Sequence, residues 1–173
     1  MLRTFLAAAA IPFVVSTASA QAKAPSPVNE ARLLWKSIIV NINKTADELS
    51  EQMYAFRPTP DVRSAGEMIA HVAGSQKMFC AMALGEKVPD EGDIEKSAKT
   101  KAAIVAGLKE SNTYCERAYA QADENVKAPV DVFGEQHPRF YALLMNATHD
   151  GEHYGNLVTY MRLNKIVPPS SRR

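Results

Sequence analysis

The sequence has no marked excess of either charge, no internal repeat and no low-complexity tract. Lys and Arg together number 20, and Asp and Glu together number 19. A balanced surface gives no electrostatic reason to expect nucleic acid or an anionic membrane as a partner. At 173 residues, the chain has the length of one domain that can bury a core without additional cross-links.

Long apolar runs are also lacking, except at the N-terminus. There Arg3 precedes an apolar run from Phe5 to Val15, and Ala18-Ser19-Ala20 is the small-x-small pattern that signal peptidase cleaves. The run is shorter than the ~20 residues that span a bilayer, and the charged and turn-forming residues of QAKAPSP follow, which argues against a retained or buried N-terminal helix. We therefore expect residues 1–20 to be a cleaved signal peptide. Residues 21–173 would form an exported domain, periplasmic or secreted, without stable membrane insertion.

Cysteine is scarce, with only Cys80 and Cys115 in the chain. In an exported protein such a pair can form a disulfide, and the two residues fall near the ends of different predicted helices. Two small buried thiols are an equal alternative, because sequence does not supply the geometry that a disulfide requires.

The chain does contain four amphipathic stretches of helical length. The expected helices run from Ser26-Pro27 to Leu49, from the capping box of Ser64 and Glu67 to Gly85, from Lys99 to Ala122, and from Pro138 to Leu163. The segments between them, YAFRPTPDVR, EKVPDEGDIEKS and NVKAPVDVFGEQHP, are expected to be loops. The last has room for a short extended piece, but no convincing strand pair is found. This pattern predicts an all-α four-helix bundle.

The fourth predicted helix contains His149 and His153, which are four residues apart and can therefore reach one ion. On its own the pair is weak evidence for a metal site, and the alternative is a pair of solvated or singly hydrogen-bonded histidines at the side of a helix. His71 in the second predicted helix adds a third nitrogen, and three histidines leave further coordination open to water or substrate, as in catalytic metal sites. Imidazole ligands suit Zn²⁺, Ni²⁺ or another borderline divalent ion. His137, just before Pro138, is interpreted as a capping or loop residue.

The stretch from His149 to His153 also matches the H-x-x-E-H pattern of inverzincin peptidases. Those enzymes are much larger and take another ligand from a glutamate far downstream. Here only twenty residues follow His153, none of them acidic, and Glu152 lies on the wetter side of the helix. We therefore reject the peptidase interpretation.

Several segments together resemble the DinB/YfiT-like family of metalloenzymes: Trp35, FRPTPDVRSAGEMIAHV, KSAKTKAAI and HDGEHYGNLVTYMRLNKIVPPSS. The resemblance implies an up-down-down-up four-helix bundle, a divalent metal held by His71, His149 and His153, and often a homodimer. Characterised relatives act as isomerases or S-transferases on low-molecular-weight thiols. Reduced thiols are scarce outside the cytoplasm, so such chemistry is not expected of an exported chain.

The leading hypothesis is thus an exported metalloprotein that acts on a small-molecule substrate as a hydrolase or transferase. The alternatives are a non-catalytic bundle that binds metal or a small ligand, and a structural bundle with dispersed histidines. Asp150 faces the buried side of its helix, where it could accept a proton from a histidine N–H or pair with an arginine.

Overall fold

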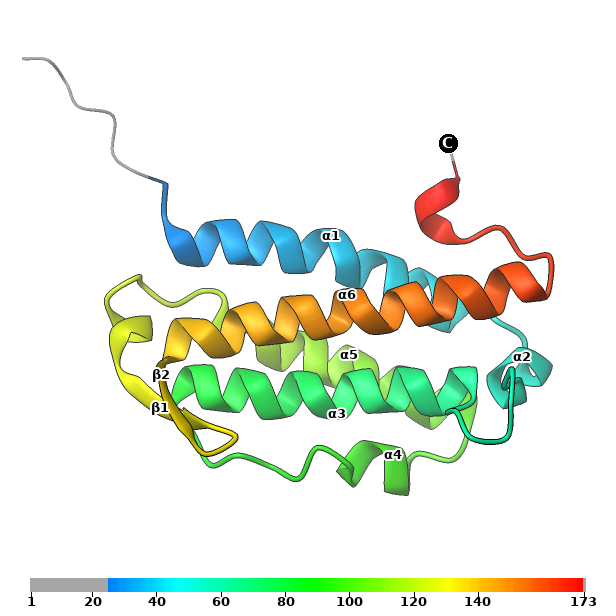
Figure 1. Ribbon diagram of the computed structural model, residues 1–173, viewed down its shortest axis with the longest axis horizontal. Coiled ribbons are helices and arrows are strands. Elements are labelled where there is room, and N and C mark those ends of the chain that lie inside the picture. Colours follow the sequence, from blue (N-terminus) through cyan, green and yellow to red (C-terminus); the bar gives the residue numbers. More distant parts are fainter. Residues whose placement is uncertain (1–24, 173) are drawn as a thin grey trace, which may run out of the picture.

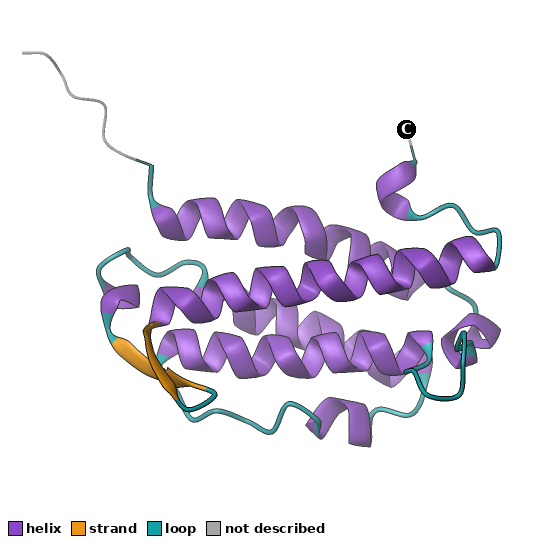
Figure 2. Cartoon of the chain, in the orientation of Figure 1, coloured by secondary structure: helices purple, strands orange, loops and turns teal. Residues whose placement is uncertain are grey.

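The computed structural model describes residues 25–172, and four long helices lie side by side in it (Figures 1 and 2). Helices α1 and α6 run in one direction and α3 and α5 in the other, which is the expected up-down-down-up order (Figure 1). The predicted signal peptide lies outside the described residues. Within residues 25–172, no helix is long and apolar enough to cross a membrane. The four helices are α1 (Pro27–Glu48), α3 (Ala65–Leu84), α5 (Lys101–Ala118) and α6 (Arg139–Leu163).

The helix ends follow their capping chemistry. The capping box of Ser64 and Glu67 is present at the start of α3, and Gly85 ends that helix with a left-handed φ of 71°, which glycine adopts without steric cost. Helix α5 is shorter than predicted at both ends. Thr100 caps it by accepting from the backbone N–H of Ala103.

Two short helices were not predicted. One ends two residues into the predicted loop YAFRPTPDVR and the other lies within the predicted loop EKVPDEGDIEKS, so both loop predictions are corrected here. The helices are α2 (Glu51–Ala55), capped by Ser50, and α4 (Asp93–Ser97). Two 3-10 turns, η1 (Asn125–Lys127) and η2 (Pro169–Ser171), complete the helical elements of residues 25–172. Five residues make little more than one turn, too few for a helical periodicity to show in a sequence.

The expectation of no strand pair is wrong as well. Strands β1 (Pro129–Val132) and β2 (Glu135–Pro138) pair antiparallel, with Val132 opposite Glu135. Phe133 and Gly134 form the two-residue turn, both with positive φ, as the right-handed twist of a hairpin favours. The predicted short extended piece is therefore one strand of a hairpin. Gly134, a residue typical of two-residue hairpin turns, was the feature of the sequence that indicated it.

Helix α3 is the interior helix of the bundle. All but three of its 20 residues are buried, because α5 and α6 pack against it and the connection between α3 and α5 returns along it. We call this connection, residues 85–100, the crossover; it contains α4. A histidine on α3 is consequently held inside the protein, with little freedom to move away from a partner on α6.

A disulfide between Cys80 and Cys115 joins α3 to α5. Both residues are fully buried. The structure thus decides between the two alternatives for this pair in favour of the cross-link. The loop that it closes contains the whole crossover, so the covalent bond fixes the two parallel helices between which the crossover runs.

Candidate metal centre

The three predicted ligands converge. His71 comes from α3, and His149 and His153 from successive turns of α6. Their ligand nitrogens all lie within 4.8 Å of one another. The Nε2 atoms of His149 and His153 are 3.0 Å apart, and the ring centroid of His71 is 5.1 Å from that of His149 and 4.8 Å from that of His153. The three histidines are therefore positioned to hold one metal ion.

All three rings are largely shielded from water. His71 is 7% and His153 8% exposed, and the side chain of His149 is 16% exposed. Burial lowers the pKa of each imidazole, because a charged ring is poorly solvated there. For His149, burial and then the neighbouring His153 and His71 lower the pKa to about 3. Neutral imidazole is the form that binds metal. Burial therefore keeps the three histidines in the form that binds Zn²⁺, Ni²⁺ or a similar divalent ion.

The outward-facing nitrogens differ in their partners. The Nδ1 atom of His71 lies 3.6 Å from Oε2 of Glu95, and Nδ1 of His153 lies 3.4 Å from the side-chain amide of Asn156. The Nδ1 atom of His149 is buried and has no hydrogen-bond partner in the described part of the chain. A partner at the outer nitrogen fixes the ring and its tautomer so that the inner nitrogen faces an ion. Of the three rings, that of His153 has such a partner, and Glu95 lies just beyond hydrogen-bonding distance of His71.

Two acids on the crossover approach the histidines, and sequence analysis did not identify them. The Oε1 atom of Glu91 lies 3.8 Å from Nε2 of His71 and 4.0 Å from Nε2 of His149. Glu95, on α4, also accepts a hydrogen bond of 2.9 Å from Nε of Arg63. Both acids lie in EKVPDEGDIEKS, a polar segment that gives no sign of folding back over α3.

Asp150 is completely buried, as expected. Neither of its carboxyl oxygens has a hydrogen-bond partner among the described residues, so it makes neither of the two interactions considered for it. Burial raises its pKa well above the ordinary value, and the nearby Trp35 opposes this only in part. The Trp35 indole N–H itself donates to Oε1 of Gln76 over 2.9 Å.

The remaining histidine, which we interpreted as a capping or loop residue, lies instead in a strand. His137 is in β2, where its ring stacks on Tyr141 with 4.0 Å between ring centroids, and its Nε2 is 3.4 Å from Glu135. It does not belong to the group that could hold a metal. Glu152 is exposed on α6, as expected for a residue on the wetter side.

A pocket of about 750 Å³ opens beside His153. Its wall is formed by the loop between α2 and α3, the start of α3, and one face of α6. Tyr160 donates from its hydroxyl to the carbonyl of Arg63 over 2.9 Å, which fixes the loop against α6. The polar lining residues include Arg57, Arg63, Glu67, Glu95, His153, Asn156 and Tyr160.

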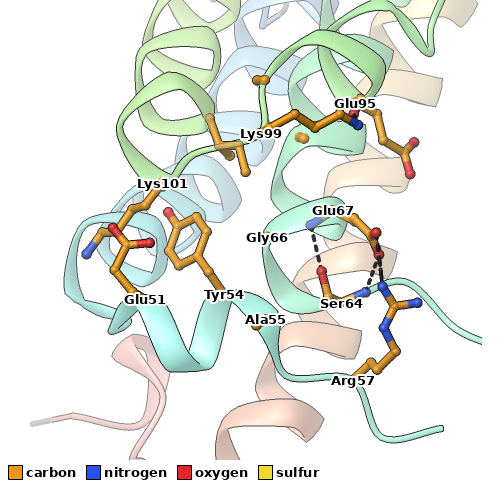
Figure 3. Close-up of a pocket in the computed structure, with 13 residues that line it drawn as sticks. Glu51, Tyr54, Ala55, Arg57, Ser64, Gly66, Glu67, Glu95, Lys99 and Lys101 are labelled. Atoms are coloured by element: carbon orange, nitrogen blue, oxygen red, sulfur yellow. Dashed lines mark hydrogen bonds and ion pairs between the residues drawn. The ribbon is translucent and has the colours of Figure 1, made fainter. Parts of the chain in front are cut away.

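A second hollow, of about 360 Å³, lies where α2, the start of α3 and the start of α5 meet (Figure 3). Several of its polar groups are already paired. Lys101 donates to the carbonyls of Asp47 and Leu49 at the end of α1, and Glu67 accepts from Arg57 and from the backbone of Ser64. No histidine lines it, but Glu95, which lies 3.6 Å from His71, lines both this hollow and the pocket beside His153.

The fold and site define a helical-bundle protein with three histidines gathered between two of its long helices. A model of the DinB superfamily matches residues 39–157. The chain belongs to the DinB superfamily, and the resemblance found in the sequence is confirmed. A search of curated proteins gave no match.

Solved structures with the same fold agree. A DinB-like protein from Bacillus cereus superposes with a TM-score of 0.69 at 19% identity, over 80% of this chain and 93% of that one. A DinB-like protein from Bacillus subtilis gives 0.61 at 21% identity, over 83% and 99%. A mycothiol-dependent maleylpyruvate isomerase gives 0.62 at 14% identity, over 78% and 66%. At these identities the similarity concerns the fold alone.

Proposed function

We propose that this protein binds one divalent cation, Zn²⁺ or Ni²⁺, through His71, His149 and His153, and that it uses the ion in a hydrolytic or group-transfer reaction. The observation that supports the proposal is the convergence of three buried, neutral imidazoles from two helices on one point. When bound, such an ion polarises a substrate oxygen or lowers the pKa of a water molecule.

The pocket beside His153 supports an enzyme over a metal carrier, because one of the proposed ligands lines a hollow that opens to the surface. Its volume suits a small-molecule substrate. In this proposal Asn156 and Glu95 orient His153 and His71, and Arg63 holds Glu95 in place through their ion pair. The lining carries both signs of charge, so the substrate must present polar groups to it.

We also propose that the protein works outside the cytoplasm. The support is the Cys80–Cys115 disulfide, since disulfides persist in oxidising compartments and are rare in the cytosol. The N-terminal pattern of residues 1–20 agrees with this proposal. Chemistry that depends on a reduced low-molecular-weight thiol fits such a compartment poorly, although a structural neighbour is a mycothiol-dependent isomerase.

The test begins with mature protein purified without a histidine tag. Elemental analysis should find one divalent ion per chain, and a panel of hydrolase and transferase substrates should reveal a turnover that is lost in His153→Ala. A His137→Ala variant, whose imidazole lies outside the cluster, is the matched control. Metal without turnover would support the non-catalytic alternative, and an absence of metal would refute the proposal.

A further inference from the structure

The backbone of the crossover lies directly against α3 where Glu91 meets Gly74. Gly74 has no side chain, and a Cβ built on it would lie 1.9 Å from the carbonyl oxygen of Glu91. Only glycine at position 74 allows the backbone of Glu91 to lie this close to the helix. Gly74 follows His71 by three residues, so the contact lies one helical turn from a proposed ligand.

The side chain of Glu91 is held at the same place. Ser75, four residues after His71 and fully buried, donates from its hydroxyl to Oε1 of Glu91. This is the same oxygen that lies 3.8 Å from Nε2 of His71 and 4.0 Å from Nε2 of His149. Two consecutive residues of α3 thus hold Glu91 in place. Gly74 lets its backbone lie against the helix, and Ser75 binds its carboxylate, which is directed toward the histidines.

We propose that Glu91 is a fourth protein ligand of the divalent ion, through Oε1. This inference rests on the proposed function, which places the ion on the three histidines. A zinc ion can expand from four to five ligands, so a fifth position stays open for the water or substrate oxygen of the proposed function. Ligand atoms at about 2.0–2.2 Å from a tetrahedral ion stand ~3.3 Å apart. The distances of 3.8 Å to His71 and 4.0 Å to His149 exceed this by about 0.5 and 0.7 Å, displacements that small rotations of a glutamate side chain supply.

The other nearby acids are placed differently. Glu95 places Oε2 3.6 Å from Nδ1 of His71, and its Oε1 accepts from Arg63, so it approaches a different nitrogen of that ring from the one that Glu91 approaches. Glu152 is exposed. Among the acids near the cluster, Glu91 is therefore the one whose oxygen approaches two inner nitrogens. Its negative charge also offsets part of the charge that an ion would carry into a largely buried site.

The experiment compares Glu91→Gln with Asp93→Asn, a matched control that removes one carboxylate charge two residues away on the same segment. Zn²⁺ affinity is measured at pH 7.5 by competition with a chromogenic chelator, and the visible absorption spectrum of bound Co²⁺ reports the ligand set. We expect Glu91→Gln to weaken Zn²⁺ binding by more than about tenfold, since loss of a direct ligand should cost at least as much as loss of a residue that only supports a ligand, and to change the Co²⁺ spectrum. Asp93→Asn should leave both as in the wild type.

Ser75→Ala provides a second, milder variant. It leaves the carboxylate in place but removes the hydroxyl that holds it, so the affinity should fall by a smaller factor in the same direction. Circular dichroism establishes that each variant is folded. If folded Glu91→Gln binds Zn²⁺ with wild-type affinity and an unchanged Co²⁺ spectrum, the inference is wrong and the three-histidine site stands. If the wild type binds neither ion, the proposed function fails and the inference fails with it.

Discussion

The Nε2 atoms of His149 and His153 face each other at 3.0 Å. Two neutral imidazoles at this distance need a proton or a cation between their nitrogens, because two facing lone pairs repel each other. Without an ion, one ring can donate to the other only if the two adopt different tautomers. A divalent ion would bind both nitrogens at once, and the pair is already arranged for it by the one-turn spacing on α6.

Acid should destabilise the metal-free protein through these rings. Burial lowers the pKa of all three histidines in the folded state, that of His149 to about 3. Histidines of the unfolded chain take up protons near pH 6.5, whereas the buried rings of the folded protein do not. The contribution of these rings to the free energy of unfolding is therefore complete above pH 6.5 and is lost as the pH falls toward 3. Each unit of pKa difference corresponds to about 1.4 kcal/mol. Thermal unfolding with a chelator present, at pH 7, 5 and 4, should show a steadily falling melting temperature.

His149→Ala is the control for that measurement. Its melting temperature should fall less steeply between pH 7 and pH 4, because the ring with the strongly lowered pKa is gone. A variant with the same slope as the wild type would show that His149 does not contribute to the acid sensitivity.

Removing one ligand should affect metal binding far more than removing the outlying histidine. His71→Ala deletes the proposed ligand on α3, so the ion would keep only the pair on α6 and Glu91. We expect a loss of Zn²⁺ affinity of at least about 100-fold, more than the 10- to 100-fold typical of outer supports. Isothermal titration with Zn²⁺ measures it, and His137→Ala should titrate as the wild type does. Similar losses in both variants would contradict the assignment of the site.

Much of this site could be predicted from the sequence because its signals are local. His149 and His153 share one helix, so their proximity follows from helical geometry alone. The capping box at Ser64 and the stop at Gly85 fix the ends of α3, and the position of His71 on an inward face follows from its apolar neighbours.

The contribution of the crossover could not be predicted, because it depends on how a polar segment folds back. Glu91 reaches the histidines through a backbone contact with Gly74, a relationship between residues 17 positions apart with no periodicity to reveal it. The hairpin was not predicted for a similar reason. Its strands are four residues long, and the pairing depends on the positive φ values of Phe133 and Gly134 more than on any alternating pattern.

The close contact between Gly74 and Glu91 should make position 74 intolerant of any side chain. Gly74→Ala places a methyl group where the carbonyl oxygen of Glu91 now lies, so the crossover must move away from α3. In an ordinary buried helix position this substitution would stabilise the helix by about 1 kcal/mol. Here we expect a loss of stability of about 1–3 kcal/mol, as for overpacking, together with weaker Zn²⁺ binding. Chemical denaturation measures the first effect, and Gly155→Ala, where a Cβ meets nothing within 4 Å, is the control.

Asp150 should limit stability at neutral pH. Its carboxyl is fully buried without a partner among residues 25–172, and burial raises its pKa above the usual 3.8. Because the pKa of Asp150 is higher in the folded protein, the residue contributes its full stabilisation below about pH 4. That contribution is lost as the pH rises through the pKa of the folded state. Asp150→Asn keeps the shape and removes the charge. Its melting temperature should exceed that of the wild type at pH 8, by about 2–4 °C per kcal/mol gained, and the difference should vanish at pH 4.

Reduction of the Cys80–Cys115 disulfide should weaken the fold without removing the histidine cluster. The bond closes a loop across a sequence separation of 35 residues, for which the chain-entropy relation gives about 4 kcal/mol of stabilisation. A Cys80→Ala/Cys115→Ala variant should therefore unfold at a markedly lower denaturant concentration, yet bind Zn²⁺ with wild-type affinity when folded, since neither sulfur is among the proposed ligands. The same variant should be insensitive to dithiothreitol, whereas the wild type should lose stability in it. Equal stability of the two proteins under oxidising conditions would mean that the cross-link does not stabilise the bundle.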